Sequence, residues 1–276
     1  MALTVNTNMA AMSAANSLNS TQGSLAETLG RVSSGLRITK AADDAAGAAV
    51  AQNLSTQARS GRQAIRNAND GISVIQTAEA ATKEVLSILD RLRELAVQSS
   101  SDTLDDDERE YIETEGDELE LEIERIAQVS SFNGTDLANN ATGTKLAVQV
   151  GLDKTSNSQI DITLQNLTLG STGLNISAIA LDASSTARAA IETIDTAIDS
   201  VNKARAAYGA TQNRLDSAIS NMSSYVEALS AAASRIEDAD YAHETAEMTR
   251  LQVMQQAGVA ALGQARGMNQ AVLSLL

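Results

Sequence analysis

A row of apolar residues with alternating spacings of three and four runs through residues 191–236. This spacing places every member on one face of an α-helix, and such faces pack together in coiled coils. Arg205 and Gln212 are the only polar members. The row consists of Ile191, Ile194, Ile198, Val201, Arg205, Tyr208, Gln212, Leu215, Ile219, Met222, Val226, Leu229, Ala233 and Ile236. The sequence therefore predicts one long coiled-coil helix.

Two further rows of the same kind precede it. The first consists of Ile75, Ala78, Thr82, Val85, Leu89, Leu92 and Ala96, and the second of Ile112, Leu119, Ile123 and Ile126. Thr103, with Asp106 three residues later, resembles the N-cap box that opens the second of these helices. The chain contains no proline, so no proline ring interrupts a helix. The predicted fold class is mainly α, a long antiparallel coiled-coil helix bundle.

Residues 127–190 have a different pattern. Asn133-Gly134 is a turn signal, and apolar residues alternate with polar ones at 146–150 and at 160–164. A link containing Gly, Asn and Ser joins the two runs, so we expect a β-hairpin. Residues 165–186 are rich in Gly, Ser, Thr and Asn without periodicity, and we expect them to be the most exposed part. The small β-hairpin region is placed at about residues 138–186.

Both ends of the chain combine helical apolar spacing with very few charges. Glu27 is the only ionised side chain in residues 1–30, and Arg266 is the only one in residues 251–276. The spaced positions are 11, 15, 18, 22, 25, 29, 32 and 36 at the front, and 248, 251, 258, 262, 265, 272 and 276 at the back, with 254, 261, 268 and 275 alongside. These rows predict paired N- and C-terminal helices.

The terminal helices are predicted to need neighbours. Ordering about 75 terminal residues costs about 1–2 kcal/mol each in backbone entropy. The ends hold about two dozen large apolar side chains, each worth roughly 1.5–3 kcal/mol when fully buried. Two helices in contact along one row would not recover that cost. We therefore expect the ends to be mobile in a lone subunit, helical where other copies bury them, and the chain to form a polymer.

Charge and composition argue against several classes of function. With 35 acidic and 20 basic residues, the net charge of −15 disfavours binding to nucleic acid or to an anionic membrane. The chain has no cysteine and therefore no disulfide. Residues 251–276 carry several glutamines, an asparagine and an arginine, too many polar groups for a membrane span. The N-terminus lacks a basic segment followed by an apolar run, so we expect secretion without a cleaved signal peptide.

No catalytic or metal-binding arrangement stands out in the sequence. His243-Glu244 resembles the start of a zinc-protease helix, but that site needs a second histidine and the chain has one. Thirteen acidic residues lie from Asp102 to Glu124 without the loop spacing of an EF-hand, which favours a solvated helix face over a calcium site. We predict a structural protein with no enzymatic activity, cofactor or metal.

Several stretches resemble bacterial flagellin in order and spacing, and together they cover almost the whole chain. They are RVSSGLRI at 31–38, ADDAAG at 42–47, RELAVQ at 93–98, FNG at 132–134, RIEDADY at 235–241, QAG at 256–258 and VLSLL at 272–276. In larger flagellins the middle of the chain carries additional outer domains, for which residues 138–186 leave no room. The chain therefore resembles a short flagellin without outer variable domains.

The resemblance implies a structural subunit that self-assembles through its terminal helices into the extracellular bacterial flagellar filament used for swimming. Residues 1–43 and 235–276 would form a terminal-helix domain lining the inner tube, and residues 44–234 a central helical-bundle domain. The flagellar export apparatus, an export chaperone, the filament cap and the hook-junction proteins are the other implied partners. The candidates for polymerisation contacts are Leu18, Leu25, Leu29, Leu36, Leu251, Leu262, Val272 and Leu276.

The resemblance also implies a host partner, Toll-like receptor 5. In flagellins that this receptor detects, an arginine and a leucine on one helix and a glutamate on the next form its main contact, and the matching positions are Arg91, Leu95 and Glu115. Arg91 and Leu95 are four residues apart and lie outside the 75–96 row. We therefore expect both side chains to be available to a partner. The competing interpretation is that they serve subunit contacts in the filament.

Two alternative functions remain open on the sequence. A hook-filament junction protein shares the terminal helices of flagellin but usually departs from it in the middle, so the agreement at 91–134 disfavours it. A secreted membrane-active coiled-coil protein would use the same amphipathic ends on lipid. Electron microscopy of the concentrated protein separates a flagellin from the membrane-active protein. Long uniform filaments indicate flagellin, and vesicle leakage without filaments indicates the membrane-active protein.

Overall fold

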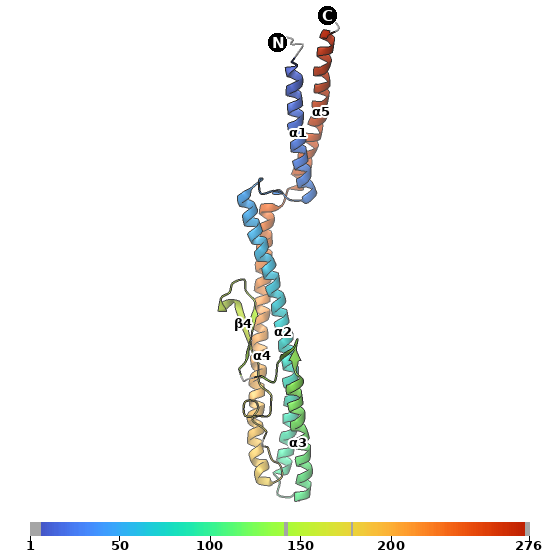
Figure 1. The fold of residues 1–276 in the computed structure, drawn as a ribbon. Coiled ribbons are helices and arrows are strands. Elements are labelled where there is room, and N and C mark those ends of the chain that lie inside the picture. Colours follow the sequence, from blue (N-terminus) through green and yellow to red (C-terminus); the bar gives the residue numbers. More distant parts are fainter. Residues whose placement is uncertain (1–6, 141–142, 178, 274–276) are drawn as a thin grey trace. The chain divides into compact units, whose positions relative to one another are not determined.

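The computed structural model describes residues 7–140, 143–177 and 179–273 (Figure 1). Within these residues the helices are α1 (Met9–Ser34), α2 (Ala45–Ser99), α3 (Asp106–Val129), α4 (Ser184–Glu237) and α5 (Tyr241–Leu273). One antiparallel strand pair is β1 (Ser131–Phe132) with β2 (Thr135–Asp136), and the other is β3 (Lys145–Gln149) with β4 (Gln159–Thr163). A short 3₁₀ turn, η1 (Ser156–Ser158), precedes β4. The predicted mainly α class is confirmed.

The chain divides into two compact units, one of residues 1–57 with 227–276 and the other of residues 58–226. Both α2 and α4 run through the two units as continuous helices. The domain boundaries predicted at 43/44 and 234/235 fall close to the connection between α1 and α2 and to the end of α4. As boundaries of functional domains they stay a prediction.

The predicted coiled-coil rows form the inner faces of α2 and α4. Every member of the row at 191–236 is buried or half-buried, and so is every member of the row at 75–96. Two polar members of these rows, Arg205 and Thr82, have partners in the chain. Arg205 lies 3.6 Å from a carboxylate oxygen of Glu79 on α2, and the buried Thr82 hydroxyl donates to the Glu79 carbonyl at 2.8 Å. The periodicity therefore identifies both helices and the faces that they bury.

The helix α3 begins two residues later than an N-cap at Thr103 requires. Its N-cap is Asp105, whose carboxylate accepts from the Asp106 N–H at 2.6 Å, while the Glu108 side chain accepts from the Asp105 N–H at 3.2 Å. The Thr103 hydroxyl instead bonds the Ser101 hydroxyl at 2.6 Å. Asp105 and Glu108 form a complete capping box, which fixes the start of the helix more firmly than Thr103 does.

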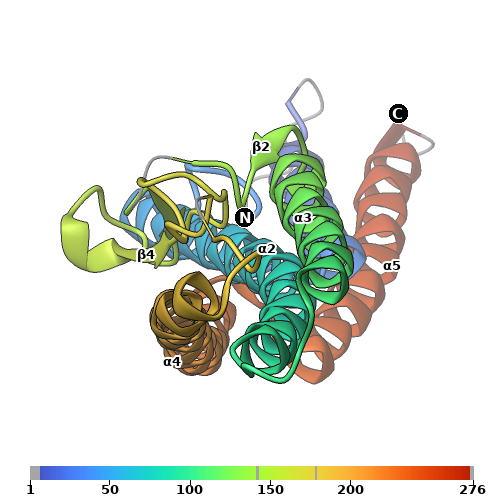
Figure 2. The same ribbon diagram turned by 90° about the horizontal axis from the view of Figure 1, so that it is seen from below.

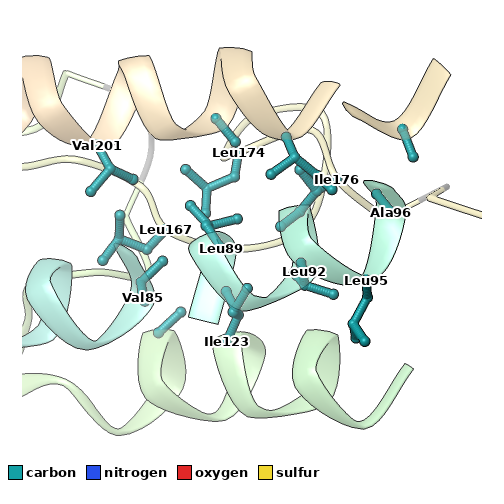
Figure 3. Close-up of a cluster of buried hydrophobic side chains, with 14 of the residues drawn as sticks. Val85, Leu89, Leu92, Leu95, Ala96, Ile123, Leu167, Leu174, Ile176 and Val201 are labelled. Carbon is teal, nitrogen blue, oxygen red and sulfur yellow. The ribbon is translucent and has the colours of Figure 1, made fainter. Parts of the chain in front are cut away.

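The core of the second unit lies where α2, α3 and α4 run alongside one another (Figures 1 and 2). Side chains of all three helices meet there with side chains of the segment 165–181, as Figure 3 shows. The segment has no regular secondary structure in its described residues, as expected. It is nevertheless not the most exposed part, because it buries Leu167, Leu174, Ile176 and Leu181 in the core. The burial of these side chains could not be predicted from the sequence, because their spacing follows neither a helical nor a strand period.

The strand region forms two short hairpins. Asn133 and Gly134 adopt φ angles of 48° and 78° between β1 and β2, and this left-handed pair favours asparagine and glycine. β3 and β4 pair with Leu146 opposite Ile162 and Val148 opposite Ile160. The inward side chains of this pair join a second core cluster with Ile75, Tyr208 and Leu215. The predicted alternating runs at 146–150 and 160–164 are therefore confirmed as a hairpin.

Candidate functional site

The terminal helices α1 and α5 pack against each other (Figure 1). The buried or half-buried side of α1 includes Ala11, Ala14, Leu18, Thr21, Leu25, Thr28 and Val32, and that of α5 includes Glu244, Met248, Leu251, Gln255, Gly258, Leu262 and Ala265. Both sets follow the alternating spacing of a coiled coil. The predicted pairing of the N- and C-terminal helices is confirmed.

Polar contacts at the two ends of this pair show that the helices run antiparallel. The Asn8 amide donates to the Ala265 carbonyl at 3.0 Å, and its side-chain oxygen caps α1 by accepting from the Ala11 N–H at 2.9 Å. At the other end, Arg31 Nε lies 3.1 Å from a carboxylate oxygen of Glu244, and both side chains are mostly buried. These two contacts fix the register of α1 against α5, because a shift of one turn would break both.

The segment RVSSGLRI ends α1 rather than continuing it. Gly35 takes a left-handed conformation with a φ of 73°, and its N–H donates to the Arg31 carbonyl at 2.8 Å. Leu36 then forms an isolated antiparallel bridge with Asp238, and the Arg37 N–H donates to the Glu237 carbonyl at 2.7 Å. Leu36 is therefore not part of a helical row, contrary to the predicted spacing. Gly35 caps the end of α1 at Ser34, so the helix stops before it reaches Leu36.

The outer face of the terminal helix pair carries large apolar side chains that a single chain leaves exposed. We define this outer face as Met9, Met12 and Leu29 of α1 with Val253, Met254 and Val259 of α5. Leu29 is 54% exposed, although the sequence placed it in the inward row. The inward position belongs to Thr28, which is 1% exposed. The inner row of α1 runs through Ala14, Thr21 and Thr28, where the predicted row has residues 15, 22 and 29.

The other predicted polymerisation residues lie in different places. Leu251 is buried in the pair, and Leu18, Leu25 and Leu262 are half-buried on its inner side. The side chain of Val272 and the whole of Leu276 lie outside the described residues. Leu29 is thus the one predicted candidate among the described residues that belongs to the outer face.

The proposed receptor-contact residues come from α2 and α3. Arg91 Nε and Nη2 donate to the same Glu115 oxygen at 2.9 and 2.6 Å, and Nη1 donates to Glu94 at 3.1 Å. These hydrogen bonds, that to Glu115 first, raise the pKa of the Arg91 guanidinium above its usual value. Arg91 and Glu115 are both exposed. The structure therefore brings these two residues together on the surface of the second unit.

Leu95 does not share this surface. Its side chain is 1% exposed and lies in the core beside Leu92 and Ile123 (Figure 3). The expectation that it is available to a partner is wrong, because α2 is covered by α4 on one face and by α3 on another. Leu92, a member of the 75–96 row, also lies next to Gly116 of α3. One row with a single period therefore does not describe all the buried positions of a helix with two neighbours, and Leu95 is one of the positions it leaves out.

The described residues offer little for other chemistry. Among them, no group of three histidine or acidic side chains is gathered as a metal site requires. No helix in the described part of the chain is long and apolar enough to cross a membrane. The described residues form long paired helices, and large apolar side chains are exposed on the terminal pair. This fold defines the class of coiled-coil helical proteins.

Comparison with known proteins identifies the family. Residues 5–143 match the model of the bacterial flagellin N-terminal helical region, and residues 191–276 match that of the C-terminal helical region. A flagellin of Halalkalibacterium halodurans is 40% identical over 99% of both chains. The flagellar filament 33 kDa core protein of Treponema phagedenis is 37% identical over 99% of both chains. The crystal structure of Bacillus cereus flagellin is similar over 57% of this chain and 88% of that one, with 30% identity and a TM-score of 0.50.

The chain belongs to the bacterial flagellin family. It is a structural subunit of the extracellular flagellar filament, and its role in motility follows from that family. The agreement over the full length, middle included, favours a filament subunit over a hook-filament junction protein.

Proposed function

We propose that the chain polymerises into the filament through the outer face of the α1/α5 pair. The observation that carries this proposal is the exposure of large apolar side chains on both helices of the pair. Exposed apolar side chains on a helix pair can supply contacts to neighbouring copies, which remove them from water. Contacts with several neighbouring copies would cover them and would repay the cost of ordering the ends.

The polymerisation residues then fall into two groups. Leu18, Leu25, Leu251 and Leu262 hold α1 and α5 together, so their substitution would weaken assembly through the pair. Leu29 would contact a neighbouring copy directly. Leu36, Val272 and Leu276 stay candidates on the resemblance to flagellin.

A test of this surface compares exposed apolar residues inside and outside it. We expect Leu29→Gln and Val253→Gln to leave the helical content of the monomer unchanged and to raise the concentration needed for polymerisation about tenfold or more. Val97→Gln is the matched control, because Val97 is also exposed but lies on α2 outside the outer face. Sedimentation and electron microscopy measure the outcome. Filaments from Leu29→Gln and Val253→Gln at the parent's concentration would contradict the proposal.

Removing residues 251–276 gives a second test. The truncated chain loses one side of the pair, so it should fail to polymerise while residues 58–226 keep their fold. Circular dichroism would show retained helix with a cooperative melt. Normal filaments from the truncated chain would show that α5 is dispensable for assembly.

The remaining partners are proposed on the family resemblance. They are the flagellar export apparatus with an export chaperone, the filament cap and the hook-junction proteins. We also propose secretion without a cleaved signal peptide and the absence of enzymatic activity, which agree with a family of structural proteins. Cell fractionation that recovers extracellular filaments whose subunits keep an intact N-terminus would support secretion without a cleaved signal peptide.

Recognition by Toll-like receptor 5 stays a proposal for Arg91 and Glu115. The support is that both side chains are exposed and joined by hydrogen bonds, which presents a fixed polar pair on the surface. Leu95 would support this pair from the core rather than touch the receptor. The same surface would also serve subunit contacts, so we expect the monomer to activate the receptor and the filament to be silent.

A further inference from the structure

Methionine is concentrated on the outer face of the terminal helix pair. Met9 and Met12 of α1 and Met254 of α5 make up half of the side chains that define this face, and they are 66%, 57% and 45% exposed. Met9 and Met12 are three residues apart, which places them on one side of α1. The outer face therefore presents thioether sulfur to solvent as well as apolar carbon.

The other methionines that the structure describes are less accessible. Met248 is half-buried on the inner side of the α1/α5 pair, and Met222 is half-buried on α4. A Cβ atom added at Gly61 of α2 would lie 3.1 Å from the Met222 sulfur, so this sulfur rests against α2. Met1 and the side chain of Met268 lie outside the described residues. Exposure thus separates the three outer-face methionines from the two half-buried ones.

The composition of the chain leaves these sulfurs as the reactive ones. The chain has no cysteine, so its sulfur is all in thioethers. A thioether attacks a hydroperoxide through a sulfur lone pair, an S–O bond forms and the O–O bond breaks. The departing oxygen takes the proton of the transferred hydroxyl and leaves as water or an alcohol. Sulfur loses two electrons, the peroxide is reduced by two, and the apolar side chain becomes a polar sulfoxide.

We propose that Met9, Met12 and Met254 form an oxidation site that controls assembly: a hydroperoxide oxidises them in the monomer, and the sulfoxides then block polymerisation. This inference rests on the proposed polymerisation through the outer face. In the monomer, water solvates each sulfoxide oxygen. A contact built for apolar side chains would remove that water without supplying a donor, which disfavours the contact. Reduction of the sulfoxide restores the original side chain.

The filament is expected to respond differently from the monomer. Neighbouring copies that cover the outer face also keep the oxidant away from its sulfurs, so oxidation is confined to chains that have not yet assembled. Met254 should react last of the three. It is the least exposed, and its sulfur accepts from Arg250 Nη1 at 3.2 Å. Oxidised chains are therefore kept out of the filament, whereas finished filaments stay intact.

Treatment of the dilute monomer with hydrogen peroxide tests the proposal. Mass spectrometry of proteolytic peptides should find sulfoxide at Met9 and Met12 before Met222, which serves as the reference inside the same chain. The concentration needed for polymerisation should rise about tenfold. Recovery of assembly after treatment with methionine sulfoxide reductases would show that oxidised sulfur is the cause. Circular dichroism establishes that the oxidised monomer is folded.

Replacing the outer-face methionines by leucine separates this site from general oxidative damage. Leucine keeps an apolar side chain of similar volume and has no sulfur. The polymerisation concentration of the triple variant Met9→Leu/Met12→Leu/Met254→Leu, whatever its own value, should not change on peroxide treatment. Met222→Leu is the matched control and should stay as sensitive as the parent. A triple variant that loses assembly after peroxide, or a parent that assembles normally with sulfoxide at all three positions, would overturn the oxidation site.

Peroxide treatment of finished filaments gives an independent result. The three outer-face methionines should stay unoxidised under conditions that oxidise them in the monomer, and equal oxidation in both states would overturn the proposal. Failure of the proposed polymerisation surface is a separate outcome. It is decided by Leu29→Gln and Val253→Gln without any oxidant, so an outer face that these variants support can stand while the oxidation site is rejected.

Discussion

Glu120 carries a testable pH dependence of the second unit. Its carboxyl lies on α3 in a narrow cleft with Leu92, Ile179 and Leu181. Burial, followed by the nearby carboxylates of Asp117 and Glu113, raises the pKa of Glu120 from 4.5 to about 7. The folded protein therefore prefers the protonated form, and ionising the carboxyl in place costs free energy of folding.

The direction and size of the effect follow from linkage. The pKa of Glu120 is higher in the folded chain than in the unfolded chain, so the stabilisation by its proton is complete below about pH 4.5 and is lost as the pH rises through about 7. A fully buried carboxyl with this change in pKa would lose about 3 kcal/mol. Glu120 is half-buried, so solvent screening reduces the expected loss to about 1–2 kcal/mol.

Replacing Glu120 by glutamine isolates this cost. We expect Glu120→Gln to raise the free energy of unfolding by about 1–2 kcal/mol at pH 8 and by no more than a few tenths at pH 4.5. Urea melts of the dilute monomer followed by circular dichroism measure both values. Glu110→Gln is the control, because Glu110 is an exposed carboxylate on the same helix. An equal gain at the two pH values, or no gain at pH 8, would refute the reasoning.

Three further predictions concern the ends, the core and the receptor surface. Limited proteolysis should remove about 40 residues from each end of the dilute monomer and spare both ends in filaments, whereas protected monomer ends would contradict the expected mobility. Leu229→Ala, at a buried position of α4, should cost about 2–5 kcal/mol in urea melts, and a cost below about 0.5 kcal/mol would place it outside the core. Arg91→Ala should preserve stability and lower the receptor response about tenfold, or 1.4 kcal/mol, whereas Leu95→Ala should destabilise the core. A dose–response curve for folded Arg91→Ala that overlays the parent's would remove Arg91 from the contact.

Much of the fold is predictable because long periodic rows leave few alternatives. The row at 191–236 extends over most of α4, and its members are buried or half-buried as the spacing requires. The hairpin follows from two alternating runs, and its register pairs Val148 with Ile160. In each case one face of an element meets one neighbour, so a single period describes the burial.

The candidate site was less predictable where a helix has more than one neighbour or where its packed side consists of small residues. Leu95 is buried because α2 has two helical neighbours, and a single row cannot describe two contacts. Thr28 rather than Leu29 faces α5, because the inner row of α1 runs through Ala14, Thr21 and Thr28, small residues that a search for large apolar side chains does not select. The cleft around Glu120 depends on residues 179–181, whose position no local pattern indicates.

The packing of the segment 165–181 limits where this chain could gain length in evolution. An insertion beside Leu167 or Ile176 would pull an apolar side chain out of the core and open a cavity there. The connection from Gly151 to Thr155 between β3 and β4 is different, because its side chains are exposed or half-buried and the strands on either side hold its ends together. Additional surface domains, or a grafted epitope, would be accommodated at this turn with least disturbance of the helical scaffold.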